Sequence, residues 1–245
     1  MNKIILVTGG NKGIGKAISI QLAEQGYFIC INYNTDKESA DSIIDEIILK
    51  KGKATAIQAD ISIEKSVVKL FDEIDKINGT LVGLINNAGI LGEQSTLAEM
   101  SSQRILKTFS TNVIGTFLCS KEAIKRMSTK YNGDGGGIVN ISSGASKSGS
   151  PNEYIDYAST KGAIDTFTIG LAKELATENI RVNAIRPGFI ETDMHKIPNR
   201  LESVKEVIPM KRVGQPEEIA DAVSWLLSDK ATYTTGAIID VAGGK

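Results

Sequence analysis

Short apolar runs alternate with longer segments of mixed polarity along the chain. The apolar runs predict buried strands at residues 4–7, 27–32, 53–59, 81–85, 138–142, 180–185 and 237–241. Between them, apolar residues at helical spacing predict helices at residues 16–24, 37–51, 63–77, 101–127, 157–177 and 216–227. Strands that alternate with helices form a parallel sheet with helices on both faces. We therefore predict one doubly wound α/β domain over residues 1–245.

Two of the predicted helices begin beside polar residues suited to capping. Thr35 or Asp36 is expected to cap the helix that begins at Lys37, and Ser62 is expected to cap the helix after the third strand. Such a residue accepts a hydrogen bond from an N–H group of the first helical turn, which has no partner within the helix.

Polar and small residues follow the predicted strands. Gly9, Asp60, Asn86, Ser142 and Pro187 come at the ends of the first, third, fourth, fifth and sixth strands. The carboxyl ends of parallel strands meet at one edge of a sheet, and ligands bind beyond that edge. The functional site is therefore expected where these residues come together.

The first strand leads into a glycine-rich loop and then into a helix. The loop contains Gly9, Gly10, Gly13 and Gly15. The N–H groups of the first helical turn lack partners, the helix dipole is positive at that end, and glycine lets a phosphate approach the backbone. The loop is compatible with a dinucleotide, with a nucleoside triphosphate, or with a tight turn that holds no ligand.

Two standard fingerprints fit this loop only in part. Residues 10–16 have the Gly-x4-Gly-Lys spacing of a triphosphate loop, but Ala17 stands where a Ser or Thr should hold Mg²⁺. A Gly-x-Gly-x-x-Gly pattern that starts at Gly13 fails at Ile18. Hydrolysis of a nucleoside triphosphate is therefore disfavoured.

The composition argues against several classes of protein. Of the 245 residues, 41% are hydrophobic and 23% are charged, and the net charge is -1, so neither a nucleic-acid partner nor a membrane surface is indicated. No apolar run reaches the roughly 18 residues of a transmembrane helix. The chain enters its first predicted strand without a signal peptide, so we expect a cytoplasmic protein.

The cysteine and histidine content predicts no metal site and no disulfide. Cys30 falls in a predicted strand and Cys119 in a predicted helix, and both are expected to be buried free thiols in a reducing cytosol. The single histidine, His195, cannot complete a zinc site.

The segment Thr8-Gly-x-x-x-Gly13-Ile-Gly15 resembles the opening of the short-chain dehydrogenase/reductase family. The other motifs of the family follow in order along essentially the whole chain: Asp60-Ile61, Asn86-Asn-Ala-Gly89, Asn112, Ser143, Tyr157-Ala-Ser-Thr-Lys161, Pro187-Gly188 and Thr192. The resemblance implies a Rossmann fold with a seven-stranded sheet in the order 3-2-1-4-5-6-7. It also implies an NAD(P)-dependent oxidoreductase that acts on CH–OH groups.

The candidate catalytic pair is Tyr157 and Lys161, which are four residues apart and share one face of a helix. Free tyrosine is a poor base at neutral pH, but a lysine ammonium and an oxidised nicotinamide lower its pKa. We therefore expect Tyr157 to give or take the proton of the reacting group. By resemblance, Lys161 also binds the nicotinamide ribose, Ser143 holds the reacting oxygen, and Asn112 completes a proton relay through water.

Neighbouring residues of the same types are weaker candidates. Tyr154 has Ala158 at the fourth position after it, so it cannot form the pair and is expected to line the pocket. The usual family spacing to Tyr157 favours Ser143 over the more distant Ser142. A Ser-His-Asp hydrolase is the alternative class of enzyme, but the chain has no Gly-x-Ser-x-Gly elbow.

The resemblance also implies a set of cofactor-binding residues. They are Gly9, Asn11, Lys12, Gly13, Ile14, Gly15, Asn34, Asp60, Ile61, Asn87, Ala88, Gly89, Tyr157, Lys161, Pro187, Gly188, Ile190 and Thr192.

NADP(H) is expected to be preferred over NAD(H). Tyr33 stands about where NAD-preferring relatives carry an aspartate, whose charge would repel a 2′-phosphate. Lys12 is similar to the basic residue that NADP-dependent members place beside that phosphate, and Asn34 and Lys37 are further candidates. Asp36 argues for NAD(H), because it lies roughly where the dinucleotide rule places a ribose-binding acid. Its predicted role as a helix cap is the favoured alternative.

Three variable segments are expected to choose the substrate: residues 90–100, 144–156 and 189–213. The last of these mixes polar residues with prolines and has no long periodic run, so we expect a mobile lid there.

The substrate class rests on a narrower resemblance. Residues 191–194 and 208–217 are similar to those of 3-oxoacyl-carrier-protein reductases and of bacterial glucose dehydrogenases. Such reductases dock an acidic carrier protein through basic residues, whereas Asp134 and Glu178 occupy the corresponding places here and would repel it. A free small carbonyl or alcohol is therefore preferred to a carrier-bound substrate of fatty-acid synthesis. Non-enzymatic NADP-binding regulators or scaffolds typically lose the tyrosine or the lysine, which this chain retains.

Residues 225–227 and the last predicted strand occupy positions at which relatives pair into dimers and tetramers. The same residues are also consistent with an ordinary core. We expect a homodimer or a homotetramer.

Overall fold

The computed structural model of the chain is described for residues 1–192 and 204–245. Its centre is one seven-stranded sheet in the order β3-β2-β1-β4-β5-β6-β7, in which neighbouring strands are parallel. The strands are β1 (Asn2–Val7), β2 (Phe28–Tyr33), β3 (Lys53–Gln58), β4 (Gly79–Asn86), β5 (Gly136–Ile141), β6 (Ile180–Pro187) and β7 (Ile238–Val241). Both the number and the order of the strands confirm the prediction.

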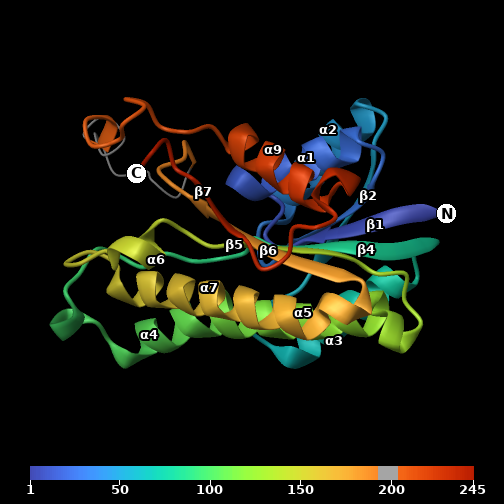
Figure 1. Ribbon diagram of the computed structural model, residues 1–245, viewed down its shortest axis with the longest axis horizontal. Coiled ribbons are helices and arrows are strands. Elements are labelled where there is room, and N and C mark those ends of the chain that lie inside the picture. The colour runs from blue at the N-terminus through green and yellow to red at the C-terminus, as the bar shows by residue number, and fades with distance from the viewer. Residues whose placement is uncertain (193–203) are drawn as a thin grey trace.

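Helices cover both faces of this sheet (Figure 1). The described α-helices are α1 (Gly13–Glu24), α2 (Lys37–Leu49), α3 (Glu64–Asp75), α4 (Ser102–Phe109), α5 (Gly115–Met127), α6 (Ala145–Ser148), α7 (Ile155–Leu175) and α9 (Pro216–Leu227). Figure 1 shows α1, α2 and α9 on one face, and α3, α4, α5 and α7 on the other. Shorter turns are η1 (Leu97–Glu99), η3 (Thr129–Tyr131), η4 (Ala176–Glu178) and η6 (Asp229–Ala231).

The core explains why the first strand is apolar throughout. Ile4 and Leu6 belong to the core cluster that includes residues of α3, α5 and α7, whereas Ile5 and Val7 belong to the cluster that includes residues of α1 and α9. Successive side chains of a strand point to opposite faces of the sheet. A strand that is covered on both faces therefore needs an apolar residue at every position.

One of the two predicted caps is present and the other is not. Asp36 caps α2, because its side chain accepts a hydrogen bond from Ser39 N. The prediction for Ser62 is wrong: Ile63 is the N-cap of α3 and makes no side-chain cap. The N–H and the hydroxyl of Ser62 both donate to Asp60 Oδ1, at 2.9 and 2.6 Å. A carboxylate accepts hydrogen bonds strongly, so it holds the Ser62 hydroxyl. This local turn replaces the expected cap.

The predicted helix over residues 101–127 is present but not uniform. A π-helical turn, η2 (Ser110–Ile114), separates α4 from α5. Such turns inside α-helices are rare and often lie at functional sites. This one carries Asn112.

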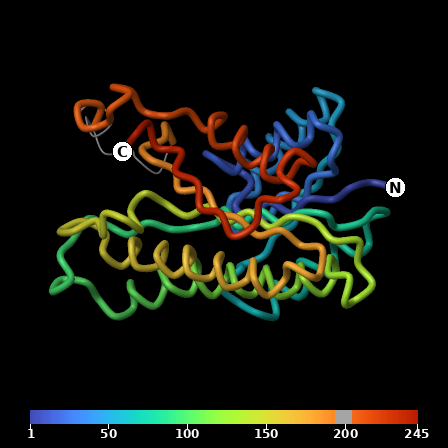
Figure 2. The backbone as a smooth tube through the Cα atoms, in the orientation of Figure 1, coloured from blue at the N-terminus to red at the C-terminus, as the bar shows by residue number. Residues whose placement is uncertain are grey.

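Helices from opposite ends of the sequence lie side by side on one face of the sheet. Figure 2 shows the red tube of α9 next to the blue tube of α1. Gln21 Nε2 donates to Asp221 Oδ1 at 2.7 Å, and Gln25 Nε2 donates to Ser224 Oγ at 2.6 Å. The last described helix therefore covers the helix that follows the glycine loop.

Three further expectations concern single residues and segments. Cys30 and Cys119 are buried free thiols, and burial raises the pKa of each to about 12. None of the described helices is long and apolar enough to cross a bilayer. The predicted lid over residues 189–213 lies partly outside the described residues, and so does His195.

Candidate active site

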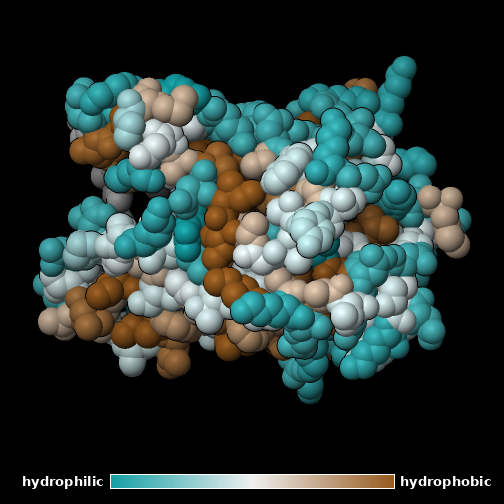
Figure 3. Space-filling model, viewed as in Figure 1, coloured by the Kyte–Doolittle hydropathy of each residue, from teal (hydrophilic) through white to brown (hydrophobic). Residues whose placement is uncertain are grey.

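A cleft of about 1620 Å³ opens at the carboxyl ends of the strands. Figure 3 shows the surface hollowed on the left of the view, where the two helical layers part. The predicted site residues that line the cleft are Gly9, Asn11, Lys12, Gly13, Ile14, Asn34, Asp60, Ile61, Asn87, Ala88, Gly89, Ser143, Tyr157, Lys161, Pro187, Gly188, Ile190 and Thr192. Gly15 and Asn112 are not among the lining residues.

The glycine loop turns tightly between β1 and α1. Gly9 and Gly13 have φ values of +58° and +52°, a region that favours glycine. Gly15 is closely packed beneath the loop. It lies within α1 and is buried, and a Cβ atom there would stand 2.3 Å from Gly9 O and 2.5 Å from Asn87 Nδ2. Gly15 therefore lets the loop pack on itself, while Gly13 and Ile14 face the cleft.

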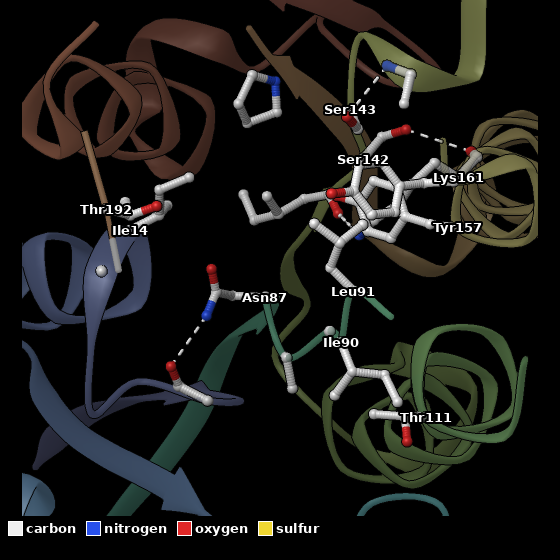
Figure 4. Close-up of a pocket in the computed structure, with 18 of the residues that line it drawn as sticks. Ile14, Asn87, Ile90, Leu91, Thr111, Ser142, Ser143, Tyr157, Lys161 and Thr192 are labelled. Atoms are coloured by element: carbon white, nitrogen blue, oxygen red, sulfur yellow. Dashed lines mark hydrogen bonds between the residues drawn. The ribbon is translucent and has the colours of Figure 1, made fainter. Parts of the chain in front are cut away.

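Thr8 and Asn87 join the glycine loop to the loop after β4. Thr8 Oγ1 accepts hydrogen bonds from the N–H groups of Asn87 and Ala88, both at 3.0 Å. In return, Asn87 Nδ2 donates to the carbonyl oxygens of Thr8 and Gly9, also at 3.0 Å (Figure 4). Thr8 opens the glycine motif in the sequence but was assigned no role there. It fixes the distance between the two loops.

Lys12 and Asp36 form an ion pair at the rim of the cleft. Lys12 Nζ lies 3.4 Å from Asp36 Oδ2, and both residues line the cleft. Hydrogen bonds from Ser39 hold the pKa of the Asp36 carboxyl below its usual range, with a smaller contribution from Lys12. The residue that argued for NADP(H) is therefore paired with the residue that argued for NAD(H).

The end of β3 presents Asp60 and Ile61 to the cleft. The bonds from Ser62 hold the Asp60 carboxylate, and Asp60 N donates to Ser66 Oγ at 3.0 Å. Ile61 is 5% exposed and packs close to Gly115 at the start of α5. The end of β3 is thus held by hydrogen bonds at Asp60 and by packing at Ile61.

Asn112 lies behind the cleft and not in it. Its side chain binds the backbone of Ile90 like a strand partner: Oδ1 accepts from Ile90 N at 2.8 Å and Nδ2 donates to Ile90 O at 3.0 Å. Nδ2 is also 3.2 Å from Thr160 Oγ1, which in turn donates to Tyr157 O at 2.6 Å. The π-turn therefore uses Asn112 to tie the loop after β4 to α7.

Ser143, Tyr157 and Lys161 gather on one side of the cleft, across from Asn87, Ile14 and Thr192 (Figure 4). Ser143 lies close enough to the Tyr157 hydroxyl to lower its pKa. The Ser143 Oγ atom also accepts from Ala145 N at 3.1 Å. Lys161 Nζ donates to Ile141 O at 2.6 Å and lies 5.5 Å from the centroid of the Tyr157 ring. The three predicted side chains are thus brought together.

The surroundings of this group shift two pKa values in opposite directions. Burial raises the pKa of Tyr157, and the hydrogen bond from Ser143 opposes that rise in part. Burial lowers the pKa of Lys161 to about 8, and the charge of Asp165 opposes that fall. At neutral pH the tyrosine is therefore protonated and the lysine is charged. The expected lowering of the tyrosine pKa does not occur in the protein alone, because burial dominates.

The two weaker candidates also have clear positions. Ser142 is buried, and its hydroxyl donates to Asp165 Oδ1 at 2.6 Å and not to Tyr157. Tyr154 is 4% exposed and contributes to the cleft wall, as expected. Of the two serines, Ser143 is the one that lowers the pKa of Tyr157.

Two buried ion pairs beside Tyr157 and Lys161 were not found from the sequence. Arg104 on α4 binds Asp156 through two hydrogen bonds of 2.9 and 3.0 Å, and Arg186 on β6 binds Asp165. Arg104 and Asp156 are 52 positions apart in the sequence, and Arg186 and Asp165 are 21 positions apart. No local pattern therefore predicts either pair. The only local signal is that each carboxylate lies within four residues of a candidate catalytic residue.

Comparison with known proteins supports the same assignment. A family model described as Enoyl-(Acyl carrier protein) reductase matches residues 9–245. The uncharacterized oxidoreductase YgfF of Escherichia coli is 53% identical over 99% of each chain. The 3-oxoacyl-[acyl-carrier-protein] reductase FabG of Staphylococcus aureus is 39% identical over 100% of this chain and 98% of its own length.

A solved structure extends the match to three dimensions. The acetoin dehydrogenase YohF from Salmonella typhimurium superimposes with a TM-score of 0.87 and is 32% identical, covering 100% of this chain and 97% of that one. These matches span the glycine loop, the sheet and the Ser143–Tyr157–Lys161 group. The chain therefore belongs to the short-chain dehydrogenase/reductase family and is an NAD(P)-dependent oxidoreductase that acts on CH–OH groups.

Proposed function

We propose that the protein transfers a hydride between NADP(H) and a small carbonyl compound or secondary alcohol, with Tyr157 as the general acid and base. The observation that carries this proposal is the gathering of Ser143, Tyr157 and Lys161 on one side of the cleft, with the Lys161 ammonium 5.5 Å from the centroid of the Tyr157 ring. A general acid must hold its proton at the working pH and lie within reach of the reacting oxygen. Tyr157 is protonated at neutral pH and faces the cleft.

Each of the three side chains has a separate task in this proposal. The bound nicotinamide supplies or accepts the hydride. In reduction, Tyr157 donates its proton to the carbonyl oxygen, which the Ser143 hydroxyl holds; in oxidation, Tyr157 takes that proton back. The Lys161 ammonium stabilises the phenolate that forms. Lys161 also binds the nicotinamide ribose, and Asn112 supports a proton relay through water.

The cleft fits a dinucleotide along its length. Gly9 and Gly13 have positive φ values and no side chains, so the backbone at the start of α1 is open to the cleft. The N–H groups and the helix dipole at this end favour binding of a pyrophosphate. Asp60 and Ile61 would meet the adenine. Residues toward the nicotinamide end would be Asn87, Ala88, Gly89, Pro187, Gly188, Ile190 and Thr192.

The preference for NADP(H) rests on Lys12. Its ammonium lies at the rim of the cleft, close to Asn34, where a 2′-phosphate would approach. The side chain of Asp36 is 37% exposed and also caps α2, and an ion pair that solvent reaches is weak. A phosphate carries more charge than a carboxylate, so it would displace Asp36 from Lys12.

A free substrate is proposed in place of a carrier-bound one. Asp134 is exposed and Glu178 is half-buried, and Asn179 Nδ2 joins their two loops by donating to Asp134 O at 2.9 Å. Their combined charge would repel an acidic carrier protein. Because the relatives include FabG reductases, a carrier-bound substrate is the alternative to test, and the screen below includes an acyl-carrier-protein thioester.

The deciding experiment is a screen of carbonyls and alcohols, followed by NADPH and NADH absorbance, with the wild type and Tyr157→Phe. We expect Tyr157→Phe to abolish hydride transfer and to bind NADPH nearly as well as the wild type, because only the proton donor is removed. Tyr131→Phe, an exposed tyrosine outside the cleft, is the matched control. Turnover by Tyr157→Phe within about tenfold of the wild type would contradict the proposal. A KM for the carrier thioester well below that of its small mimic would instead favour the carrier-bound substrate.

The remaining expectations extend the proposal to the whole protein. We propose one domain over residues 1–245 with a lid over residues 189–213, in a cytoplasmic homodimer or homotetramer. Figure 3 shows an apolar stripe over β7, and Trp225 is 41% exposed on α9, which supports pairing at this edge. The native mass tests the assembly.

A further inference from the structure

A buried carboxylate lies one helical turn beyond Lys161. Asp165 follows Lys161 by four residues on α7, so the two share one face of the helix, and Asp165 is 8% exposed. Asp165 Oδ1 accepts from Ser142 Oγ at 2.6 Å. Asp165 Oδ2 accepts twice from Arg186, from Nε at 3.0 Å and from Nη2 at 2.8 Å. Both carboxylate oxygens are therefore bound to groups at the carboxyl ends of β5 and β6.

The ion pair continues outward as a line of alternating charges. Arg186 Nη1 lies 3.6 Å from Asp240 Oδ1, and Lys147 Nζ lies 2.9 Å from Asp240 Oδ2. Side-chain exposure rises along this line, from 11% at Asp165 and 19% at Arg186 to 38% at Asp240 and 52% at Lys147. The inner pair therefore lies where solvent screens charge least, and the outer pair lies where solvent screens it most.

Lys161 has uncharged neighbours on its other sides. Nζ donates to the carbonyl of Ile141, and the phenol ring of Tyr157 lies beside it. The other polar groups near it from the strand end, the loop after β4 and the π-turn are Ser142, Ser143, Gly89 and Asn112. Within residues 1–192 and 204–245, the charges nearest Lys161 are therefore Asp165 on its own helix and Arg186 behind Asp165.

We propose that Asp165 and Arg186 are positioning residues of the active site: together they hold Ser142 against the Lys161 turn and set the net charge that Lys161 meets from inside the protein. The inference rests on the proposed function, in which Lys161 acts on Tyr157. Ser142 reaches both groups at once, because its hydroxyl lies 2.6 Å from Asp165 Oδ1 and 3.3 Å from Lys161 O. Ser142 is followed directly by Ser143, so the same contacts hold the strand end that carries the hydroxyl proposed to bind the reacting oxygen.

The two members of the pair act on Lys161 with opposite signs. The carboxylate of Asp165 favours the charged ammonium and keeps its pKa from falling further. The guanidinium of Arg186 disfavours the ammonium and offsets part of that effect. Removing Asp165 therefore makes Lys161 easier to deprotonate, and removing Arg186 makes it harder. A pair that served only to hold the helix in place would shift Lys161 in the same direction whichever member was lost.

The test is an NMR titration of the Lys161 Cε resonance, assigned by its loss in Lys161→Met, which needs no substrate. We expect Asp165→Asn to lower the titration midpoint from about 8 by about one pH unit. Arg186→Gln should raise it by a smaller amount, because the guanidinium lies behind Asp165. The midpoint of the double variant Asp165→Asn/Arg186→Gln should lie between those of Asp165→Asn and the wild type. Glu122→Gln on α5 is the control, because Glu122 is equally buried and ion-paired but lies outside the cleft.

Shifts of opposite sign support the proposal, and shifts of the same sign, or no shift, overturn it. Thermal melting monitors the fold of each variant. If Asp165→Asn does not fold, Arg186→Gln decides alone, because only an upward shift agrees with the proposal. Ser142→Ala should leave the midpoint in place, since it removes a hydrogen bond but no charge.

A kinetic arm separates this inference from the proposed function. With an alcohol substrate from the screen, Asp165→Asn should move the acidic limb of kcat to higher pH, and Arg186→Gln should move it to lower pH. A cationic Lys161 stabilises the Tyr157 phenolate. The pH of the acidic limb of kcat therefore rises when the pKa of Lys161 falls, and falls when that pKa rises. Opposite shifts in the titration without a change in the kinetic limb would contradict the role of Tyr157 and leave the effect of the pair on Lys161 standing.

Discussion

Lys161 holds a positive charge at a place where water is largely excluded. Its side chain is 4% exposed, and the lowered pKa, about 8 against a usual 10.5, measures the cost of charging it there. The unfolded chain binds this proton more tightly than the folded chain does. The folded protein is therefore destabilised by the charge at every pH below the lowered value.

We expect the stability of the wild type to rise relative to Lys161→Met as the pH increases from about 8 to 10.5. In this window the folded lysine has lost its proton while the unfolded one retains it, so the penalty is relieved. The full difference amounts to at most about 3 kcal/mol. Urea denaturation of both proteins across this pH range measures it. The exposed Lys173→Met on the same helix should run parallel to the wild type, and parallel curves for Lys161→Met as well would contradict the argument.

At the scale of single residues, sequence motifs identified most of the residues that line the cleft but did not predict the position of every one. Tyr157, Ser143 and Lys161 were predicted, because helical spacing and strand ends place them together. Gly15 and Asn112 were predicted as well, but they do not line the cleft in the described structure. Their places depend on contacts with Gly9 and Ile90, and no local pattern reports such contacts.

The helix that carries Tyr157 and Lys161 is fastened to a second helix just before the tyrosine. Arg104 on α4 binds Asp156 on α7, and only 2% of the Asp156 side chain is exposed. Burial would raise the pKa of Asp156, but hydrogen bonds from Arg104 and from backbone N–H groups outweigh burial and hold the pKa below its usual range. Gly92 packs against the same guanidinium, since a Cβ there would lie 2.6 Å from Arg104 Nε. The pair thus joins α4, α7 and the loop after β4.

We expect Arg104→Met to lower the free energy of unfolding by about 3 kcal/mol at pH 7, because it leaves a buried carboxylate without its partner. Without Arg104, burial raises the pKa of Asp156. The deficit is therefore complete above that raised pKa and shrinks as the pH falls toward 3.8. Urea denaturation at pH 7 and pH 5 tests both statements.

A second variant tests the cause of that loss. Arg104→Met/Asp156→Leu removes both charges and should regain most of the stability. Lys121→Met, which breaks an exposed pair with Glu64, should leave the midpoint essentially unchanged. An equal loss in the single and the double variant would contradict the electrostatic explanation.

At the scale of elements, the types were predictable and the details of their ends were not. Each predicted strand and helix is present, because periodicity follows from burial. The cap of α3 differs from the prediction because Asp60 competes for Ser62. The π-turn at residues 110–114 has no signal in hydrophobic spacing, since it adds one residue to a helix whose apolar face continues on both sides.

Cofactor binding acts on the whole molecule, because a ligand that binds only the folded state stabilises all of it. We expect NADPH to raise the melting temperature more than NADH at equal concentration. Lys12→Ala should weaken NADPH by about tenfold and NADH by less than about twofold, because only NADPH carries the 2′-phosphate. Asp36→Asn should strengthen NADPH, since it frees the Lys12 ammonium from its partner.

The control for this prediction is Lys16, which lies in the first turn of α1, the helix for which Lys12 is the N-cap. Lys16→Ala removes the same charge, and Lys16 pairs with Glu46 outside the cleft. It should leave the difference between the two cofactors unchanged. Equal weakening of NADPH and NADH by Lys12→Ala would assign Lys12 to the pyrophosphate and leave the cofactor preference to other residues.

At the scale of the molecule, the sheet and its order followed from the alternation of elements and from the resemblance. The pairing of distant charges did not, because Lys12–Asp36, Arg104–Asp156 and Arg186–Asp165 depend on how loops and helices approach in space. These pairs surround the cleft, so the part of the site that tunes the chemistry is the part that the sequence does not reveal.

The contact between α1 and α9 has a consequence for synthesis on the ribosome. The helix at the glycine loop leaves the exit tunnel early, but its buried face includes Ile18 and Leu22, which share a core cluster with Val223 and Leu226 of α9. Until those later residues emerge, the part of the α1 face that packs against α9 is uncovered. We therefore expect a nascent chain to acquire nucleotide affinity only near the end of translation.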